Sequence, residues 1–163
     1  MLKIGLTGGI GSGKSEVSKF FQAWGAYIFD ADKEAKHIIN TDESAQKEII
    51  KEFGSDVIDA DQNIDNQKLA RVAFQDEFYQ SALNSIVHPY VFKKIDSAFE
   101  KIQQQNKHNC FVVDAALIYE SGADTHMDYV IVITSLLRYR TERVMSKNNI
   151  TRFLVFSKKS KKI

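Results

Sequence analysis

The sequence predicts a layered α/β fold with a mostly parallel sheet. Three apolar runs, at residues 2–7, 111–117 and 129–133, are nearly continuous rather than alternating. Such runs are typical of parallel strands that are covered on both faces. Stretches with helical periodicity separate the runs, so the strands are expected to be joined by helical crossovers.

A glycine-rich loop follows the first predicted strand. Residues 8–15 read Gly-Gly-Ile-Gly-Ser-Gly-Lys-Ser, and residues 16–24 carry apolar side chains at helical spacing. Gly8, Gly13, Lys14 and Ser15 fit the phosphate-loop pattern G-x-x-x-x-G-K-[ST] in its strand–loop–helix context. A plain glycine turn would explain one or two glycines, but not Lys-Ser at this offset. The loop therefore predicts a nucleoside triphosphate site.

The residue types of this loop suit phosphate binding for separate reasons. Glycines allow consecutive N–H groups to face phosphate oxygens, and the following helix adds positive partial charge at its N-terminus. Lys14 is expected to bridge the β- and γ-phosphates, and the Ser15 hydroxyl to hold Mg²⁺. A nucleoside triphosphate and Mg²⁺ are the expected cofactors, and the predicted phosphate ligands are Gly8, Gly9, Gly11, Ser12, Gly13, Lys14, Ser15 and Glu16.

The middle of the chain is predicted to be helical. A strand at 26–29 ends in Asp30-Ala31-Asp32, and Pro89 is expected to interrupt the helical pattern and open a new helix. This stretch is too long for a simple crossover, so part of it is expected to be an inserted substrate lobe. We expect a single domain with a nucleotide-binding core at 1–30 and 108–135, a helical insertion at 31–107, and a partial lid and tail at 136–163.

Composition indicates a cytoplasmic protein. The 163 residues are 44% hydrophobic and 26% charged, with no run long enough for a membrane span and no signal segment. Cys110 is the single cysteine and is expected to be a buried core thiol. Residues 143–163 carry seven Lys or Arg and no Asp or Glu. A solvated tail or an incomplete element is favoured over a nucleic-acid partner, and no membrane partner is expected.

Three aspartates at strand ends are candidates for catalysis. Asp32 follows a strand near the phosphate loop, where open α/β sheets bind their ligands. The residues alone leave both Asp30 and Asp32 open between a helix N-cap and a general base. Asp114 ends an apolar strand and is equally open between an ordinary strand-end residue and a carboxylate that orients Mg²⁺ through water.

Taken together, these motifs resemble the dephospho-coenzyme A kinase family over about residues 1–152. The resemblance is carried by Ile4–Ser15, Asp30-Ala31-Asp32, His88-Pro89, Val113–Gly122 and Arg143. It implies a three-layer phosphate-loop kinase fold and ATP-dependent phosphorylation of the ribose 3′-hydroxyl of dephospho-CoA, the last step of coenzyme A biosynthesis. The chain departs from the family pattern at Ala116, where the family usually has proline.

The resemblance also implies roles for individual residues. It makes Asp32 the general base, leaves Asp30 as a cap or a metal-shell residue, and makes Arg143 a lid arginine that reaches the ATP phosphates. The substrate-binding residues that it suggests are Asp32, His88, Leu117 and Glu120.

Two alternative functions stay open from the sequence. One is a kinase of another small hydroxyl substrate, of the nucleoside, shikimate or gluconate type. The other is an ATP-binding protein with weak or no transfer, because residues 153–163 depart from the family pattern and the rest of the lid has no counterpart. Truncation, a frame alteration, a genuine short variant or further segments would each explain this departure. We expect a monomer or a weak homo-oligomer.

Overall fold

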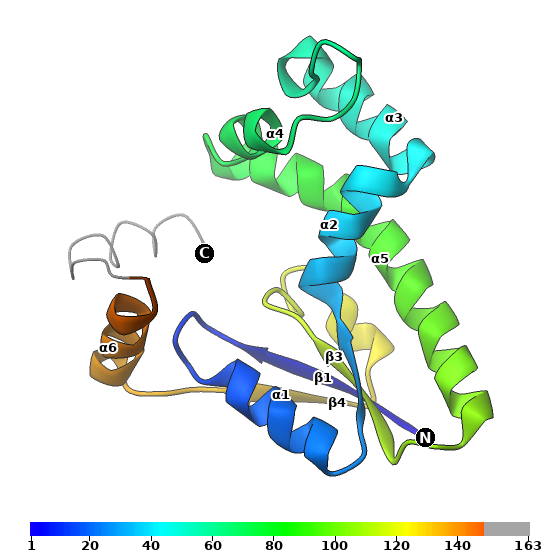
Figure 1. Ribbon diagram of the computed structural model, residues 1–163, viewed down its shortest axis with the longest axis vertical. Helices are drawn as coiled ribbons and strands as arrows, with labels where there is room; N and C mark the ends of the chain where they lie inside the picture. The colour runs from blue at the N-terminus through cyan, green and yellow to red at the C-terminus, as the bar shows by residue number, and fades with distance from the viewer. Residues whose placement is uncertain (149–163) are drawn as a thin grey trace. The chain divides into compact units, whose positions relative to one another are not determined.

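The computed structural model describes residues 1–148. The chain divides into two compact units, one holding residues 1–29 and the chain from residue 101 onwards, the other holding residues 30–100. Figure 1 labels the helices and strands of both units. Residues 149–163, the last part of the predicted lid and tail at 136–163, lie outside the described residues.

The first unit is built on a sheet with the strand order β2-β3-β1-β4. The strands are β1 (Leu2–Gly8), β2 (Tyr27–Asp30), β3 (Cys110–Asp114) and β4 (Tyr129–Ile133). Both β3 and β4 run parallel to β1, with Leu6 opposite Asp114 and Gly8 opposite Ile133. The carboxyl ends of these three strands therefore lie side by side, which confirms the predicted parallel arrangement.

Both faces of the sheet are covered. Helix α1 (Lys14–Ala23) packs Val17 and Phe21 against a core of Leu6, Ala26 and Val112. On the other face, a Cβ added at Gly5 would lie 2.8 Å from the Ile118 side chain and 3.4 Å from Met127. The segment after β3, which includes the short helix η2 (Ala123–His126), thus covers this face. Burial on both sides explains the continuous apolar runs of β1 and β3. Strand β4 lies at the edge of the sheet and, contrary to the expectation for its apolar run, leaves Tyr129 and Val132 exposed.

Strand β3 is shorter than predicted. It ends at Asp114 rather than at Leu117. The Ala115 N–H donates to the Leu6 carbonyl, and the Thr7 hydroxyl donates to the Ala116 carbonyl at 3.1 Å. These bonds fasten the segment after β3 to the carboxyl end of β1. Helix α6 (Leu137–Asn148) follows β4.

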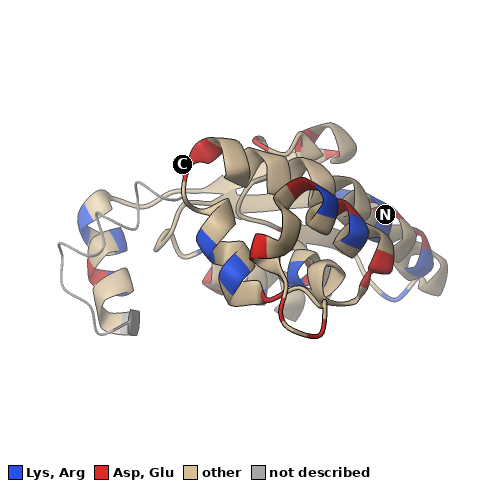
Figure 2. Cartoon of the chain, turned by 90° about the horizontal axis from the view of Figure 1, so that it is seen from above, with Lys and Arg blue, Asp and Glu red and all other residues tan. Residues whose placement is uncertain are grey.

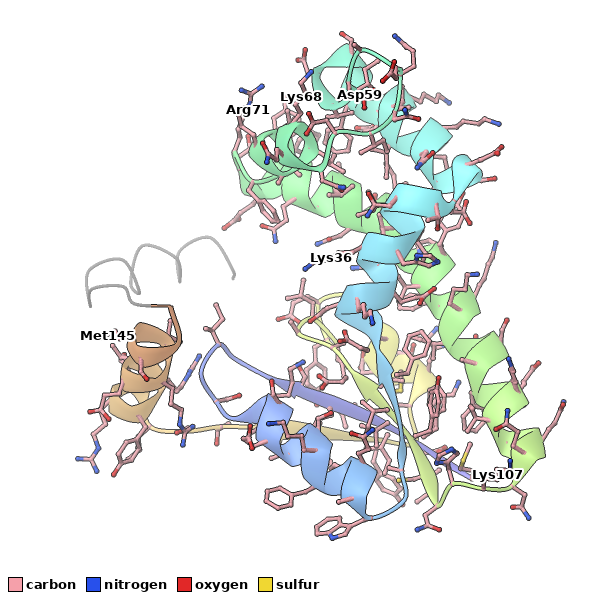
Figure 3. All side chains as sticks on the ribbon, viewed as in Figure 1. Lys36, Asp59, Lys68, Arg71, Lys107 and Met145 are labelled. Atoms are coloured by element: carbon pink, nitrogen blue, oxygen red, sulfur yellow. The ribbon has the colours of Figure 1, made fainter. Side chains whose placement is uncertain are left out.

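The second unit consists of helices whose starts are fixed by aspartate. Its elements are α2 (Ala31–Thr41), α3 (Glu43–Phe53), η1 (Gly54–Val57), α4 (Asn66–Ala73) and α5 (Glu77–Gln105), which extends past the boundary. Asp30, Asp42 and Asp65 each accept backbone N–H groups at the first turn of α2, α3 and α4. In Figure 3, Lys68 and Arg71 lie on α4, and the Lys68 ammonium donates to the Ile58 carbonyl at 2.7 Å.

The prediction that Pro89 opens a new helix is wrong. Helix α5 runs through Pro89 without a break, although proline lacks the N–H for the bond to the fourth residue before it. Val87, Val91 and Ile95 are each at most 5% exposed. Full burial of one such side chain contributes about 1.5–3 kcal/mol, so the three together offset the cost of about 3 kcal/mol for an interior proline.

No described helix is long and apolar enough to cross a membrane.

We expect Pro89→Ala to stabilise the second unit, because the new N–H can join the helix ladder and the ring clash disappears. The free energy of unfolding, measured by urea titration, should rise by about 1–2 kcal/mol once the entropy gained by the unfolded chain is subtracted. Ser97→Ala, at an exposed position of the same helix, is the control and should change it by less than about 0.5 kcal/mol. A loss of stability in Pro89→Ala would contradict this account of the helix.

Candidate functional site

The predicted phosphate loop connects β1 to α1 at the carboxyl edge of the sheet. The Ser12 N–H donates to the Gly9 carbonyl at 3.0 Å, which closes a tight turn. Gly13 has a φ of 103°, a left-handed conformation that favours glycine, and directly precedes α1. A Cβ at Gly8 would lie 2.6 Å from the Ile133 carbonyl oxygen of β4, so this position has room for hydrogen only. The motif therefore has the local geometry that a phosphate site requires.

The Ser12 hydroxyl is buried without a partner. Ser12 is 6% exposed, and among the described residues its Oγ is the buried side-chain polar atom that lacks a hydrogen bond. An unpaired buried hydroxyl costs roughly 1–3 kcal/mol, so such atoms in native proteins usually meet a ligand or water. Its position inside the glycine turn fits a phosphate oxygen as the missing partner.

Lys14 is held by a carboxylate on the neighbouring strand. Its ammonium pairs with Oδ1 of Asp114, and the two side chains are 18% and 16% exposed. Lys14 starts α1 and Asp114 ends β3, so the sheet register brings them together across 100 residues of sequence. Two of the predicted site residues thus form one charged pair beside the glycine turn.

Helix α6 supplies two arginines to the loop. Nη1 of Arg143 donates to the carbonyls of Gly11 and Ser12 at 3.1 Å, and to the Ser135 hydroxyl at 3.5 Å. Nε of Arg140 donates to the Ile10 carbonyl at 2.9 Å. The structure thus places the predicted Arg143 at the loop. It adds Arg140, which the sequence analysis missed and which only its spacing of three residues from Arg143 could have suggested.

Other predicted residues of the first unit lie at its surface or in the helix start. The Glu16 N–H donates to the Gly13 carbonyl at 3.0 Å, and its carboxylate pairs with Lys19 on the exposed face of α1. Ser15 is exposed in the first turn of α1. Leu117 is half-buried and Glu120 is exposed, both in the segment after β3.

The remaining predicted residues belong to the second unit. Oδ1 of Asp30 accepts the Lys33 N–H at 2.9 Å and caps α2, the use that the sequence left open. Asp32 is exposed in the first turn of α2. His88 is half-buried within α5, and its ring stacks on Phe92 at a centroid separation of 6.0 Å. Burial lowers the pKa of His88 below its ordinary value of 6.5.

The comparisons with known proteins agree with this geometry. A family model described as Dephospho-CoA kinase matches residues 2–161. Dephospho-CoA kinase of Fusobacterium nucleatum is 36% identical over 151 residues, which are 93% of this chain and 76% of the relative. That of Corynebacterium glutamicum is 37% identical over 150 residues, which are 92% of this chain and 76% of the relative. The chain belongs to the dephospho-CoA kinase family.

Solved structures agree on the fold. The crystal structure of TT1252 from Thermus thermophilus has a TM-score of 0.77 and 25% identity, and the match covers 99% of this chain and 80% of that one. Dephospho-CoA kinase from Campylobacter jejuni has a TM-score of 0.62 and 22% identity, covering 98% and 79%. The predicted phosphate-loop kinase fold is thereby confirmed, and the family match extends past residue 152, where the resemblance was expected to end.

We expect Ser12→Ala to stabilise the ligand-free protein by about 1 kcal/mol or more, because the mutation removes an unpaired buried hydroxyl. Urea unfolding should show this gain without ATP, and the increase in Tm on adding Mg-ATP should be smaller than for wild type. Ser121→Ala is the matched control, since the Ser121 hydroxyl donates to the Ile118 carbonyl at 3.0 Å and its removal should not stabilise. Destabilisation by Ser12→Ala would contradict an unpaired hydroxyl.

The lowered pKa of His88 predicts a pH-dependent stability. Below its ordinary value of 6.5 the unfolded chain binds a proton at His88 more readily than the folded chain does. This contribution to stability is therefore complete above pH 6.5 and is lost as the pH falls towards the folded pKa. Urea unfolding of wild type and His88→Gln gives the difference between their free energies of unfolding, which should change with pH only below pH 6.5. A difference that is constant with pH would contradict the effect of burial on His88.

Proposed function

We propose that this protein transfers the γ-phosphoryl group of ATP to the ribose 3′-hydroxyl of dephospho-CoA and so forms coenzyme A. The family supports the reaction, and one observation in this structure carries the proposal. Lys14, whose ammonium could bind a phosphate oxygen, lies beside a glycine turn in which the buried Ser12 hydroxyl has no hydrogen-bond partner within residues 1–148. This combination suits an anion that enters the turn and takes both groups as ligands.

The charged pair at the loop suggests what happens when ATP binds. Phosphate oxygens would compete with Asp114 for the Lys14 ammonium, and the released carboxylate would become available to orient a metal ion. Mg²⁺ prefers oxygen ligands and is usually held by one or two protein groups together with the substrate phosphates. The Ser15 hydroxyl and the Asp114 carboxylate fit this donor set. The ion would neutralise charge on the phosphates during transfer.

Asp32 is the proposed general base. In the transfer, the 3′-oxygen forms a bond to the γ-phosphorus, the bond to the leaving oxygen of ADP breaks, and the proton of the hydroxyl passes to the Asp32 carboxylate. An exposed carboxylate in the first turn of α2 is accessible for this role. We further propose that residues 30–100 form the substrate lobe, and that His88, Leu117 and Glu120 contact the substrate.

Three further assignments belong to the same proposal. Arg143 uses Nη1 for the loop carbonyls, and we propose that the rest of its guanidinium meets the ATP phosphates. We propose that Glu16 acts only as part of the first turn of α1, because its N–H donates to the Gly13 carbonyl and its carboxylate pairs with Lys19. We also propose that the protein works in the cytoplasm as a monomer or a weak homo-oligomer.

The test is steady-state transfer by the full chain from Mg-ATP to dephospho-CoA, with coenzyme A as the measured product. Asp32→Asn should lower kcat about 10²- to 10⁴-fold and change the affinity for ATP little, because it removes a base and no phosphate ligand. Asp30→Asn is the matched control, since asparagine also caps helices and the rate should stay near that of wild type. Lys14→Ala should abolish ATP binding and transfer.

The outcomes separate the alternatives. Transfer to a nucleoside, shikimate or gluconate but not to dephospho-CoA would replace the proposed acceptor. ATP binding without transfer to any of these acceptors would contradict the enzymatic function. A wild-type rate in Asp32→Asn would show that this residue is not the base.

A further inference from the structure

The carbonyl groups of the phosphate loop are bound by arginines of α6. Arg140 holds the Ile10 carbonyl, and Arg143 holds those of Gly11 and Ser12. The two arginines lie three residues apart and therefore on the same face of the helix. Figure 2 shows α6 at the left with bands of Lys and Arg. Three successive peptide groups of the loop thus have their oxygens directed at one cationic helix face.

The direction of these carbonyls determines the direction of the loop's N–H groups. In a planar trans peptide the C=O of one residue and the N–H of the next point in opposite directions. The carbonyls of Ile10 and Ser12 face the arginines, so the N–H groups of Gly11 and Gly13 face the other side. The intervening N–H of Ser12 closes the turn on Gly9. The arginines thereby favour the conformation in which N–H groups converge on an anion.

Arg140 also lies in close steric contact with two glycines of the phosphate loop. A Cβ at Gly9 would overlap the Arg140 guanidinium, and a Cβ at Gly11 would lie 2.5 Å from the Arg140 carbonyl oxygen and 3.0 Å from its Cα. Side chain and backbone of Arg140 therefore both lie against the loop. Gly9 and Gly11 are required by the approach of α6 as well as by the phosphate-loop motif.

We propose that Arg140 is a positioning residue that holds the phosphate loop in its nucleotide-binding conformation before ATP arrives. It acts through the Ile10 carbonyl, on the side of the loop opposite to the N–H groups, and not by contact with the reacting atoms. A loop that is already ordered loses less conformational entropy on binding, so the benefit appears in the affinity for ATP. The proposal rests on the proposed kinase function, but its effect on ATP binding can be measured without transfer.

Arg140→Gln tests the proposal, because it removes the guanidinium and keeps a polar side chain on the helix. The Kd and KM for Mg-ATP should rise about tenfold, while kcat at saturating ATP stays within about twofold. Arg140→Lys should restore part of the affinity, since its ammonium can donate to the same carbonyl. Hydrogen exchange at the amides of residues 9–13 in the ligand-free protein should become faster in Arg140→Gln.

Arg138→Ala is the matched control. Arg138 lies two residues before Arg140 on α6, and the mutation removes the same positive charge. Its Nη2 donates to the Tyr139 hydroxyl at 2.8 Å rather than to the loop. Its Kd for Mg-ATP should equal that of wild type. Gly9→Ala provides a second variant, since the added Cβ should displace the Arg140 guanidinium and weaken ATP binding without removing a charge.

Three results would overturn the proposal. They are an unchanged Kd for Mg-ATP in Arg140→Gln, an equal rise in Arg138→Ala, and a loss of kcat of more than about tenfold, which would indicate direct contact with the reacting phosphates. Failure of the proposed function would look different. Wild type would then bind Mg-ATP without forming coenzyme A, and the comparison of Kd values would still decide the role of Arg140.

Discussion

The position of β1 between two parallel neighbours is the constraint on which the nucleotide site depends. Because β3 and β4 run in the same direction as β1, all three strands deliver their carboxyl ends to one edge. The chain must turn from this edge into α1 within five residues, and the close approach of Ile133 leaves room only for glycine at position 8. The same register sets Asp114 beside Lys14. Loop shape and charge pairing thus share one cause.

The charges and dipoles around the loop are balanced from within the protein. Asp114 neutralises Lys14, and the arginines of α6 donate hydrogen bonds to the loop carbonyls, whose oxygens carry negative partial charge. A guanidinium is suited to this task because its rigid donors can bond to neighbouring oxygens at once. The loop is therefore ordered before a ligand binds, and the Ser12 hydroxyl still lacks a hydrogen-bond partner among the residues that the structure describes. Because the conformational freedom is already lost, a ligand binds with a smaller entropic cost.

The helices of the second unit depend more on interactions between near neighbours in the sequence than the strands of the sheet do. Asp30, Asp42 and Asp65 accept N–H groups two or three residues further along, so each helix start is set by its own aspartate. Asp30 also ends β2, and the chain therefore changes from strand to helix in a single residue. Asp32 follows in the first turn, where its carboxylate suits the helix dipole whatever its chemical role.

The sequence by itself determined the parts of this protein that depend on near neighbours. The phosphate loop and β4 follow from turn chemistry and from the pattern of apolar residues within a few positions, and the resemblance of the motifs identified the family. Tertiary structure decided the rest. Burial on both sides of Pro89 overrode its tendency to end a helix, and the approach of α6 to the loop made Arg140 a neighbour of Gly9. The contact of Arg140 with the loop joins residues 130 positions apart, and its energy depends on packing that no local pattern encodes.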